Sequence, residues 1–114
     1  MEDCIFCRIA RKEIPAKIVY EDKDVLAFED IHPQAPVHIL IIPKEHIATL
    51  NEVPPGRESL LGNLLIRART IAAEKGIGAD GFRCVLNTGK NSGMEVFHIH
   101  LHLLGGRRMS WPPG

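Results

Sequence analysis

The sequence predicts an α+β fold, in which a mainly antiparallel five-stranded sheet packs with one long and one short helix. Three observations support this. Five short apolar runs are separated by polar, proline or glycine connections, which is typical of strands. One longer segment has helical periodicity instead. No internal repeat or linker divides the 114 residues, so we expect one domain over residues 1–114, with 105–114 as a C-terminal tail.

The chain is expected to begin with the short helix and a β-hairpin. Asp3 is a candidate N-cap, and Pro15 lies shortly beyond the helix. The apolar side of the helix carries Ile5, Phe6 and Ile9. Residues 17–20 and 25–28 are predicted strands, because two strand-like runs across the short polar connection 21–24 indicate a hairpin.

The middle of the chain supplies the central strand and the long helix. Prolines force extended backbone in the loop 30–36, and the hydrophobic run 37–42 follows as a strand. Pro43 ends this strand because proline cannot donate to a sheet ladder. A long helix, with Gly76 as its stop, is predicted after residue 56 from one apolar stripe. The stripe consists of Leu60, Leu61, Leu64, Leu65, Ala68, Ile71 and Ala72.

Two strands complete the predicted sheet. Residues 82–87 form the first, and residues 88–93 follow it as a loop punctuated by glycines. Residues 96–104 form the last strand, and the double glycine at 105–106 opens the irregular tail. We therefore place the loop 88–93 next to the last strand.

Composition excludes several function classes. Fourteen basic side chains balance fourteen acidic ones, so the chain lacks the basic face expected for duplex nucleic acid or an anionic membrane. Three cysteines, an odd number, argue against a secreted disulfide framework. The N-terminus does not resemble a signal peptide, and no apolar run approaches the ~18 residues of a membrane span. We expect a cytoplasmic protein without nucleic-acid or membrane partners.

Three histidines alternate with apolar residues near the C-terminus. On a strand, His98, His100 and His102 would share one face, and Phe97, Ile99, Leu101 and Leu103 would face the core. Such a row suits either metal ligation or phosphoryl chemistry. Ligation of one zinc by all three is awkward because their side chains point in nearly parallel directions. A neutral imidazole can instead attack phosphorus while its neighbours donate hydrogen bonds to phosphate oxygens.

The loop before this row fits the phosphoryl alternative. Asn87 opens the loop, and Gly89 and Gly93 would let the backbone approach a ligand closely. Exposed backbone N–H groups in such a loop can hold an anion. Together with the histidines, the loop indicates a phosphate pocket.

These residues resemble the histidine triad family of nucleotide hydrolases and transferases, which is named for its His-x-His-x-His pattern. The resemblance covers almost the whole chain, and the tail resembles the Hint branch rather than the Fhit or uridylyltransferase branches. The matching stretches are Cys4-Ile5-Phe6-Cys7, Glu13-Ile14-Pro15, Phe28-Glu29-Asp30-Ile31, Pro33-Gln34-Ala35-Pro36, His38, Ile42-Pro43-Lys44, Asn87, the triad, Leu104-Gly105-Gly106-Arg107 and Trp111-Pro112-Pro113-Gly114.

The resemblance implies a purine nucleoside phosphoramidase-type enzyme. His98, His100 and His102 would be catalytic, with His100 attacking the α-phosphorus of an adenosine phosphoramidate or acyl-adenylate. A covalent nucleotidyl-imidazole would form, and water would release AMP. Two alternatives stay open: a nucleotide-binding regulatory protein with incidental turnover, and a Fhit-like dinucleoside polyphosphate hydrolase.

The resemblance also implies nucleotide contacts. His102, Asn87 and the backbone of 93–95 would hold the phosphate, and Asp30 would accept the ribose hydroxyls, although a turn cap is its alternative role. The nucleotide-binding set is Asp30, Ile31, Asn87, Gly93, Met94, Glu95, His100 and His102. The base pocket would be walled by Ile5, Phe6, Ile9, Phe28, Ile31 and Leu40, for each of which core packing is the alternative. His38 would support the triad from behind or be a buried structural histidine.

One stretch departs from the family pattern. Met94 and Glu95 stand where the family commonly has glutamine and then serine or glutamate. Methionine cannot donate a hydrogen bond, and glutamate lacks a hydroxyl. The departure puts in doubt which group protonates the leaving group and which substrate is preferred.

The N-terminal Cys4-x-x-Cys7 pair has three interpretations: half of a zinc site, packed thiols, or a redox pair. Resemblance to a zinc-binding bacterial subgroup implies a structural zinc held by Cys4, Cys7, His46 and His98. Cys84 is expected to pack as a small hydrophobe. No organic cofactor is expected. The resemblance also implies a homodimer that joins two sheets edge to edge.

Overall fold

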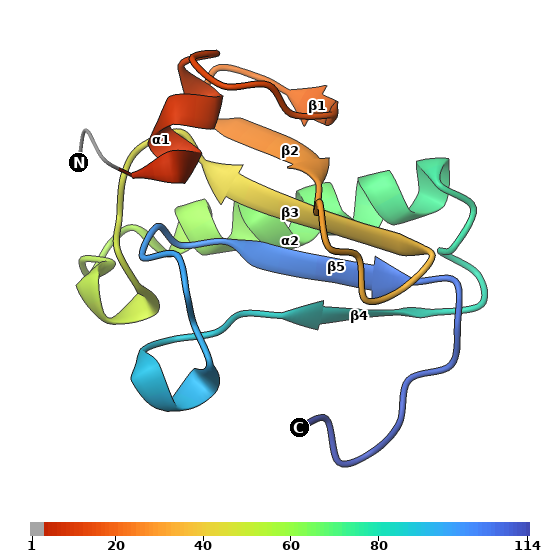
Figure 1. The fold of residues 1–114 in the computed structure, drawn as a ribbon. Coiled ribbons are helices and arrows are strands. Elements are labelled where there is room, and N and C mark those ends of the chain that lie inside the picture. Colours follow the sequence, from red (N-terminus) through yellow and green to blue (C-terminus); the bar gives the residue numbers. More distant parts are fainter. Residues whose placement is uncertain (1–3) are drawn as a thin grey trace.

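The computed structural model describes residues 4–114, and its five strands form one sheet in the order β1-β2-β3-β5-β4 (Figure 1). Every neighbouring pair is antiparallel, which confirms the predicted fold class. The strands are β1 (Ile18–Glu21), β2 (Val25–Glu29), β3 (Val37–Pro43), β4 (Phe82–Val85) and β5 (Leu101–Gly105). The helices are α1 (Ile5–Ala10) and α2 (Glu58–Glu74), with single 3₁₀ turns at Leu50–Glu52 and Lys90–Ser92.

The alternation of strand side chains divides the core between the two faces of the sheet. Helix α2 covers one face, behind the strands in Figure 1, and buries Val25, Ala27, Ile39, Ile41, Leu101 and Leu103 against its own apolar stripe. On the other face, Leu26, Phe28, Leu40 and Ile42 pack with Phe6 and Ile9 of α1. Because successive strand residues point to opposite faces, His38 and His102 lie on the α1 face.

Helix α2 follows its predicted pattern with one exception. Leu64, Ala68, Ile71 and Ala72 are buried, whereas Leu65 is 52% exposed. A neighbour in sequence lies about 100° round the helix axis, so Leu64 and Leu65 do not both face the sheet. Gly76, with φ of 77°, follows the C-terminus as expected, and the Ile77 N–H closes the turn on the Ala72 carbonyl.

Helix α1 begins differently from the prediction. The expected N-cap, Asp3, lies outside the described residues, and Cys4 occupies the N-cap position. Its sulfur accepts a hydrogen bond from the Cys7 N–H at 3.2 Å. The first cysteine is thus part of the helix start as well as a candidate ligand.

The last strand is shorter than predicted, because it begins at Leu101 instead of residue 96. Its pairing with β3 stops at Ile41–Leu101. If the pairing continued in the same register, Ile99 would lie opposite Pro43, which has no N–H to donate. The Ile99 N–H donates to the Ile47 carbonyl instead. Without strand alternation there, Phe97 is 48% exposed, contrary to the expectation that it faces the core. The strand predicted over 82–87 also ends early, at Val85.

The C-terminal tail leaves the sheet beside the proline-rich loop. Gly106 has φ of 90°, and a Cβ there would lie 2.9 Å from Pro36, so glycine suits this turn. Arg107 Nε then donates to the Gln34 carbonyl at 3.1 Å, and Trp111 is 82% exposed. In the part of the chain that the structure describes, no helix is long and apolar enough to span a membrane.

Candidate active site

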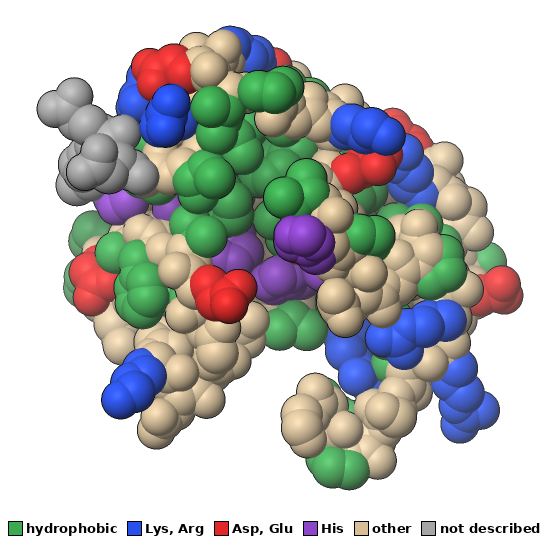
Figure 2. All heavy atoms as spheres, viewed as in Figure 1, with side chains coloured by type: hydrophobic (Ala, Val, Ile, Leu, Met, Phe, Trp, Pro, Cys, Tyr) green, Lys and Arg blue, Asp and Glu red, His purple; other side chains and the backbone are tan. Residues whose placement is uncertain are grey.

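A pocket of about 360 Å³ lies on the α1 face of the sheet, within the size range of small-molecule sites. Figure 2 shows histidine side chains in a hollow bordered by hydrophobic side chains. Two histidines of the triad, His100 and His102, line the pocket. The pocket therefore combines imidazole groups with a largely apolar lining.

The pocket brings together most of the residues predicted from the sequence. All eight members of the predicted nucleotide-binding set line it, and so do all six predicted base-pocket walls. Five lining residues were missed: Ile14, Pro15, Ala16, Glu29 and Val96. Ile14, Pro15 and Glu29 stand in stretches that resemble the histidine triad family. That resemblance could have predicted these three residues as part of the pocket.

His100 has a defined tautomer. Its Nδ1 lies 2.7 Å from the His98 carbonyl, and because a carbonyl only accepts, Nδ1 carries the hydrogen. Burial lowers the pKa of His100, so the ring is neutral and Nε2 keeps its lone pair. The Phe6 ring packs against it edge to face, with ring centres 5.0 Å apart. His100 therefore has the form that a nucleophilic imidazole requires.

His38 and His102 form a hydrogen-bond chain with a single consistent direction. The Gln34 N–H donates to His38 Nδ1 at 3.0 Å, so the hydrogen of neutral His38 is on Nε2. That Nε2–H donates to His102 Nδ1 at 2.9 Å. Burial lowers the pKa of His38, and it lowers that of His102 to about 4. The hydrogen of His102 is consequently on Nε2, where it can be donated to a ligand.

Asp30 caps a turn and also lines the pocket. Oδ1 accepts the His32 N–H at 2.8 Å, as in a turn cap. Oδ2 lies 3.5 Å from His38 Nε2, and the carboxylate lines the pocket. Oδ1 of Asp30 is thus engaged in the turn, while Oδ2 can accept a hydrogen bond within the pocket.

The segment between β4 and β5 contributes Asn87, Gly93, Met94, Glu95 and Val96 to the pocket lining. Gly89 and Gly93 both have positive φ, which favours glycine at these positions. Ser92 Oγ donates to the Gly89 carbonyl at 2.6 Å and accepts the Met94 N–H at 3.3 Å. Met94 is buried and Glu95 is exposed, and both line the pocket.

His98 does not line the pocket but belongs to a second cluster with Cys4, Cys7 and His46. Its Nε2–H donates to the Pro43 carbonyl at 2.8 Å, which leaves Nδ1 unprotonated. Nδ1 faces the sulfurs of Cys4 and Cys7 at 3.3 and 3.5 Å, and His46 Nδ1 lies 3.2 Å from Cys7 Sγ. His98 is fully buried, and desolvation lowers its pKa to about 4.

This donor set fits zinc. The four ligand atoms lie within 4.8 Å of one another. Zinc–sulfur bonds are about 2.3 Å long and zinc–nitrogen bonds about 2.0–2.1 Å, so a sulfur and a nitrogen bound to one tetrahedral zinc lie about 3.6 Å apart. The sulfur–nitrogen distances in the cluster, 3.2–3.5 Å, are close to this value. The Pro43 carbonyl accepts the hydrogen of the other ring nitrogen of His98, and an acceptor of this kind commonly orients a metal-binding histidine. Burial, reinforced by Cys4, raises the pKa of the Cys7 thiol to about 11, which does not favour a redox cysteine.

The third cysteine is separate from this cluster. Cys84 packs half-buried against the α2 side of the core, as expected for a small hydrophobe. Burial raises the pKa of its thiol. It therefore offers a control position for experiments on the other two thiols.

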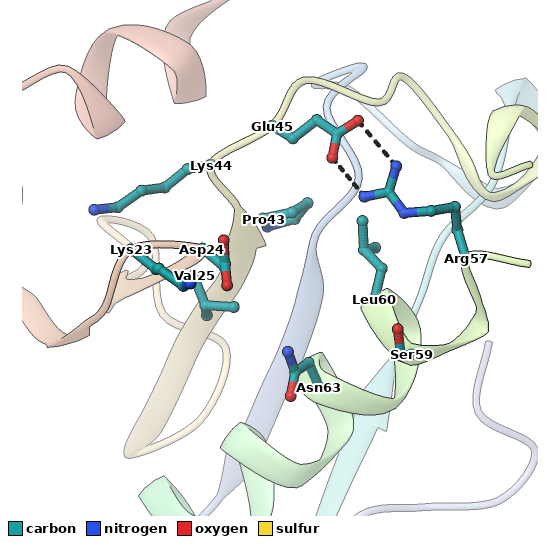
Figure 3. A pocket seen from close by; sticks show the side chains of 10 residues that line it. All are labelled: Lys23, Asp24, Val25, Pro43, Lys44, Glu45, Arg57, Ser59, Leu60 and Asn63. Carbon is teal, nitrogen blue, oxygen red and sulfur yellow. Dashed lines mark hydrogen bonds and ion pairs between the residues drawn. The ribbon is translucent and has the colours of Figure 1, made fainter.

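A pocket of similar volume, about 360 Å³, lies between the start of α2, the start of β2 and the end of β3 (Figure 3). Its lining includes Lys23, Asp24 and Lys44. Arg57 and Glu45 face each other there through two hydrogen bonds of 2.6 and 3.3 Å. Charges in this pocket are thus partly neutralised by one another, and none of the triad histidines lines it. We therefore place the candidate active site in the histidine pocket.

Comparisons with known proteins show the family of this chain. A HIT domain matches residues 11–109. Purine nucleoside phosphoramidase from Escherichia coli is 53% identical over 106 residues, covering 93% of this chain and 89% of that protein. A HIT family hydrolase from Legionella pneumophila is 58% identical with a TM-score of 0.96, covering 98% of this chain and 100% of the other.

A zinc-bound histidine triad protein from Mycobacterium smegmatis is more distant. It is 34% identical with a TM-score of 0.82, and the match covers 99% of this chain and 81% of that chain. With the domain match and these relatives, the chain belongs to the HIT domain family.

Proposed function

We propose that this chain is a nucleotide-binding hydrolase that cleaves purine nucleoside 5′-phosphoramidates, or acyl-adenylates, to AMP. The observation that carries the proposal is the orientation of His100, whose Nδ1–H is held by the His98 carbonyl while the ring lines the pocket. The identity to the E. coli phosphoramidase supports the substrate class. A nucleophile with a fixed tautomer is what an enzyme needs and a pure nucleotide binder does not.

The reaction passes through a covalent intermediate on His100. The Nε2 lone pair attacks the α-phosphorus, and the phosphorus–nitrogen bond of the substrate breaks as the leaving amine takes the electron pair and a proton from a solvent water. Water then attacks the same phosphorus and gives up a proton to the solvent, the bond to His100 breaks with its electron pair returning to Nε2, and AMP leaves. His98 donates no proton to the leaving group, because its Nε2–H is bound to Pro43 and its Nδ1 faces the thiols.

The remaining pocket residues bind the nucleotide. His102 Nε2–H, the Asn87 amide and the backbone of residues 93–95 donate to the phosphate oxygens. The Asp30 carboxylate accepts hydrogen bonds from the ribose hydroxyls. The purine lies against the apolar walls, which consist of Ile5, Phe6, Ile9, Phe28, Ile31 and Leu40.

Trapping the intermediate tests the proposal. Intact-protein mass spectrometry after mixing with an adenosine 5′-phosphoramidate should detect a nucleotidyl adduct on the wild type and none on His100→Ala. The variant should lose several orders of magnitude in turnover but still bind AMP by calorimetry. His32→Ala, at an exposed histidine outside the pocket, is the matched control.

Each alternative function has its own signature in this experiment. Near-normal turnover by His100→Ala would contradict the assignment of the nucleophile. AMP binding without an adduct or turnover would favour a regulatory nucleotide-binding protein. Preferential cleavage of dinucleoside polyphosphates would favour a Fhit-like hydrolase.

We also propose that Cys4, Cys7, His46 and His98 hold one structural zinc ion, which would join α1 to the segments after β3 and before β5. The donor set and the zinc-bound M. smegmatis relative support this. Elemental analysis of protein purified without a metal-affinity tag should find one zinc per chain, which a Cys4→Ser/Cys7→Ser variant loses. Absence of zinc from the wild type, even after zinc is supplied, would contradict the site.

Two copies of this chain are proposed to form a homodimer by joining their sheets edge to edge. Gly105 belongs to β5, so the tail comprises residues 106–114, and each tail would reach toward the partner subunit. Strand β4 lies at an edge of the sheet, where Phe82 is 37% exposed. Unpaired edges favour pairing, and two-fold dimers are the commonest oligomers. Light scattering at micromolar concentration should give a dimer mass, and a monomer mass would contradict the proposal.

A further inference from the structure

Helix α1 contributes to the nucleotide pocket and to the cysteine–histidine cluster at the same time. Ile5, Phe6 and Ile9 line the pocket. Cys4 and Cys7 provide two of the four ligand atoms of the cluster. A displacement of this helix would therefore change both places together.

The position of α1 depends on tertiary contacts. The helix has six residues, and helices shorter than about 12–15 residues are marginal in isolation. Phe6 and Ile9 pack into the core on the α1 face. Cys4 and Cys7 add polar contacts of 3.2–3.5 Å to His46 and His98, which come from the segments after β3 and before β5.

The cluster is also joined to the candidate nucleophile. The ring of His98 is held between the two thiols and the Pro43 carbonyl. The carbonyl of the same residue accepts the Nδ1–H of His100 at 2.7 Å. In addition, the Phe6 ring contacts both imidazoles edge to face, with centres 6.1 Å from His98 and 5.0 Å from His100.

Building on the proposed function, we propose that Cys4, Cys7 and His46 are positioning residues for the nucleotide reaction. They touch no substrate. They hold α1 and His98 so that the apolar wall and the His100 imidazole, which touch each other through Phe6, keep their places in the nucleotide pocket. Loss of a cluster ligand, or of a metal bound there, therefore weakens binding of the purine and lowers turnover, beyond any effect on stability.

Ligand-binding measurements on folded variants test this inference. His46→Ala and Cys7→Ser each remove one ligand atom, and Cys84→Ser removes a cysteine outside the cluster as the matched control. AMP and ribose 5-phosphate are titrated by calorimetry well below each melting temperature. AMP should bind about tenfold more weakly or worse to the first two variants, because the purine loses its apolar wall. Ribose 5-phosphate, which lacks the purine, should be affected less, and Cys84→Ser should match the wild type.

A metal experiment on the wild type gives a second, mutation-free test. AMP affinity is measured on the protein as purified, after metal removal by a chelator, and after zinc alone is returned. The affinity should fall and then recover, while circular dichroism remains that of a folded protein. The kcat and KM of a phosphoramidate should both change, since both the wall and the nucleophile are affected.

The outcomes separate this inference from the proposed function. Folded His46→Ala and Cys7→Ser proteins that bind AMP like the wild type would overturn the inference, as would equal losses for AMP and ribose 5-phosphate. If every variant and the chelated protein unfold, the cluster only stabilises the fold, and the inference is wrong. A wild type that binds AMP without turnover would overturn the proposed reaction, but the binding measurements would still decide the inference. A wild type that binds no AMP would overturn both.

Discussion

Replacing His38 should reduce turnover, because His38 determines which nitrogen of His102 carries the hydrogen. The Gln34 N–H holds His38 Nδ1 as an acceptor, so His38 Nε2 donates to His102 Nδ1 at 2.9 Å. In His38→Phe, the hydrogen of His102 can move to Nδ1, and Nε2 then presents a lone pair to the phosphate. A hydrogen bond to a charged group contributes about 1.5–3 kcal/mol, so kcat/KM should fall by about 10- to 150-fold.

The assay compares three proteins on an adenosine 5′-phosphoramidate: wild type, His38→Phe and His38→Gln. The Gln side-chain nitrogen can occupy the place of Nε2 and donate to His102, so His38→Gln should recover most of the lost kcat/KM. Urea denaturation separates the effect from stability, since His38 is buried. A His38→Phe protein within about threefold of the wild-type kcat/KM would refute the reasoning. Equal losses in a well-folded His38→Gln protein would refute it as well.

Three other predictions concern stability and specificity. First, the pKa of His102 is about 4 in the folded protein, below its ordinary value of 6.5, so between these values the unfolded chain binds more protons. The free energy of unfolding from urea titrations should be highest above pH 6.5 and fall as the pH drops toward 4; a flat profile, or an unchanged slope in His102→Asn, would contradict this. Second, Leu26→Ala empties a fully buried position and should cost about 2–5 kcal/mol in the same assay. Leu65→Ala, at a 52% exposed position, should change it by no more than about 0.5 kcal/mol, and similar costs for both would be inconsistent with the packing. Third, truncation after Gly106 removes the proposed tail, so relative kcat/KM values for different leaving groups should shift while AMP affinity changes little. Unchanged selectivity would argue against a role of the tail.

Local patterns in the sequence were sufficient for most of the fold. The apolar runs 25–28 and 37–42 predicted strands, and both lie in strands of the sheet, where Leu26 and Ile41 are fully buried. The stripe through Leu64, Ala68 and Ile71 predicted the long helix, and these three side chains are buried against the sheet. These features follow from backbone periodicity, which depends on residues a few positions apart. The pocket residues were predictable for another reason, because whole stretches of the chain resemble the histidine triad pattern.

The arrangement of the histidines depends on contacts between distant parts of the chain, which no local pattern contains. Strand alternation predicted a strand from residue 96 onward, yet β5 begins only at Leu101, because Pro43 cannot pair with the segment before it. Pro43 is 55 residues away from His98, and its carbonyl accepts the His98 Nε2–H. The tautomer of His102 likewise depends on His38, 64 residues away. The hydrogen on an imidazole resides where a neighbouring acceptor or donor requires it, and these neighbours come together only when the chain has folded.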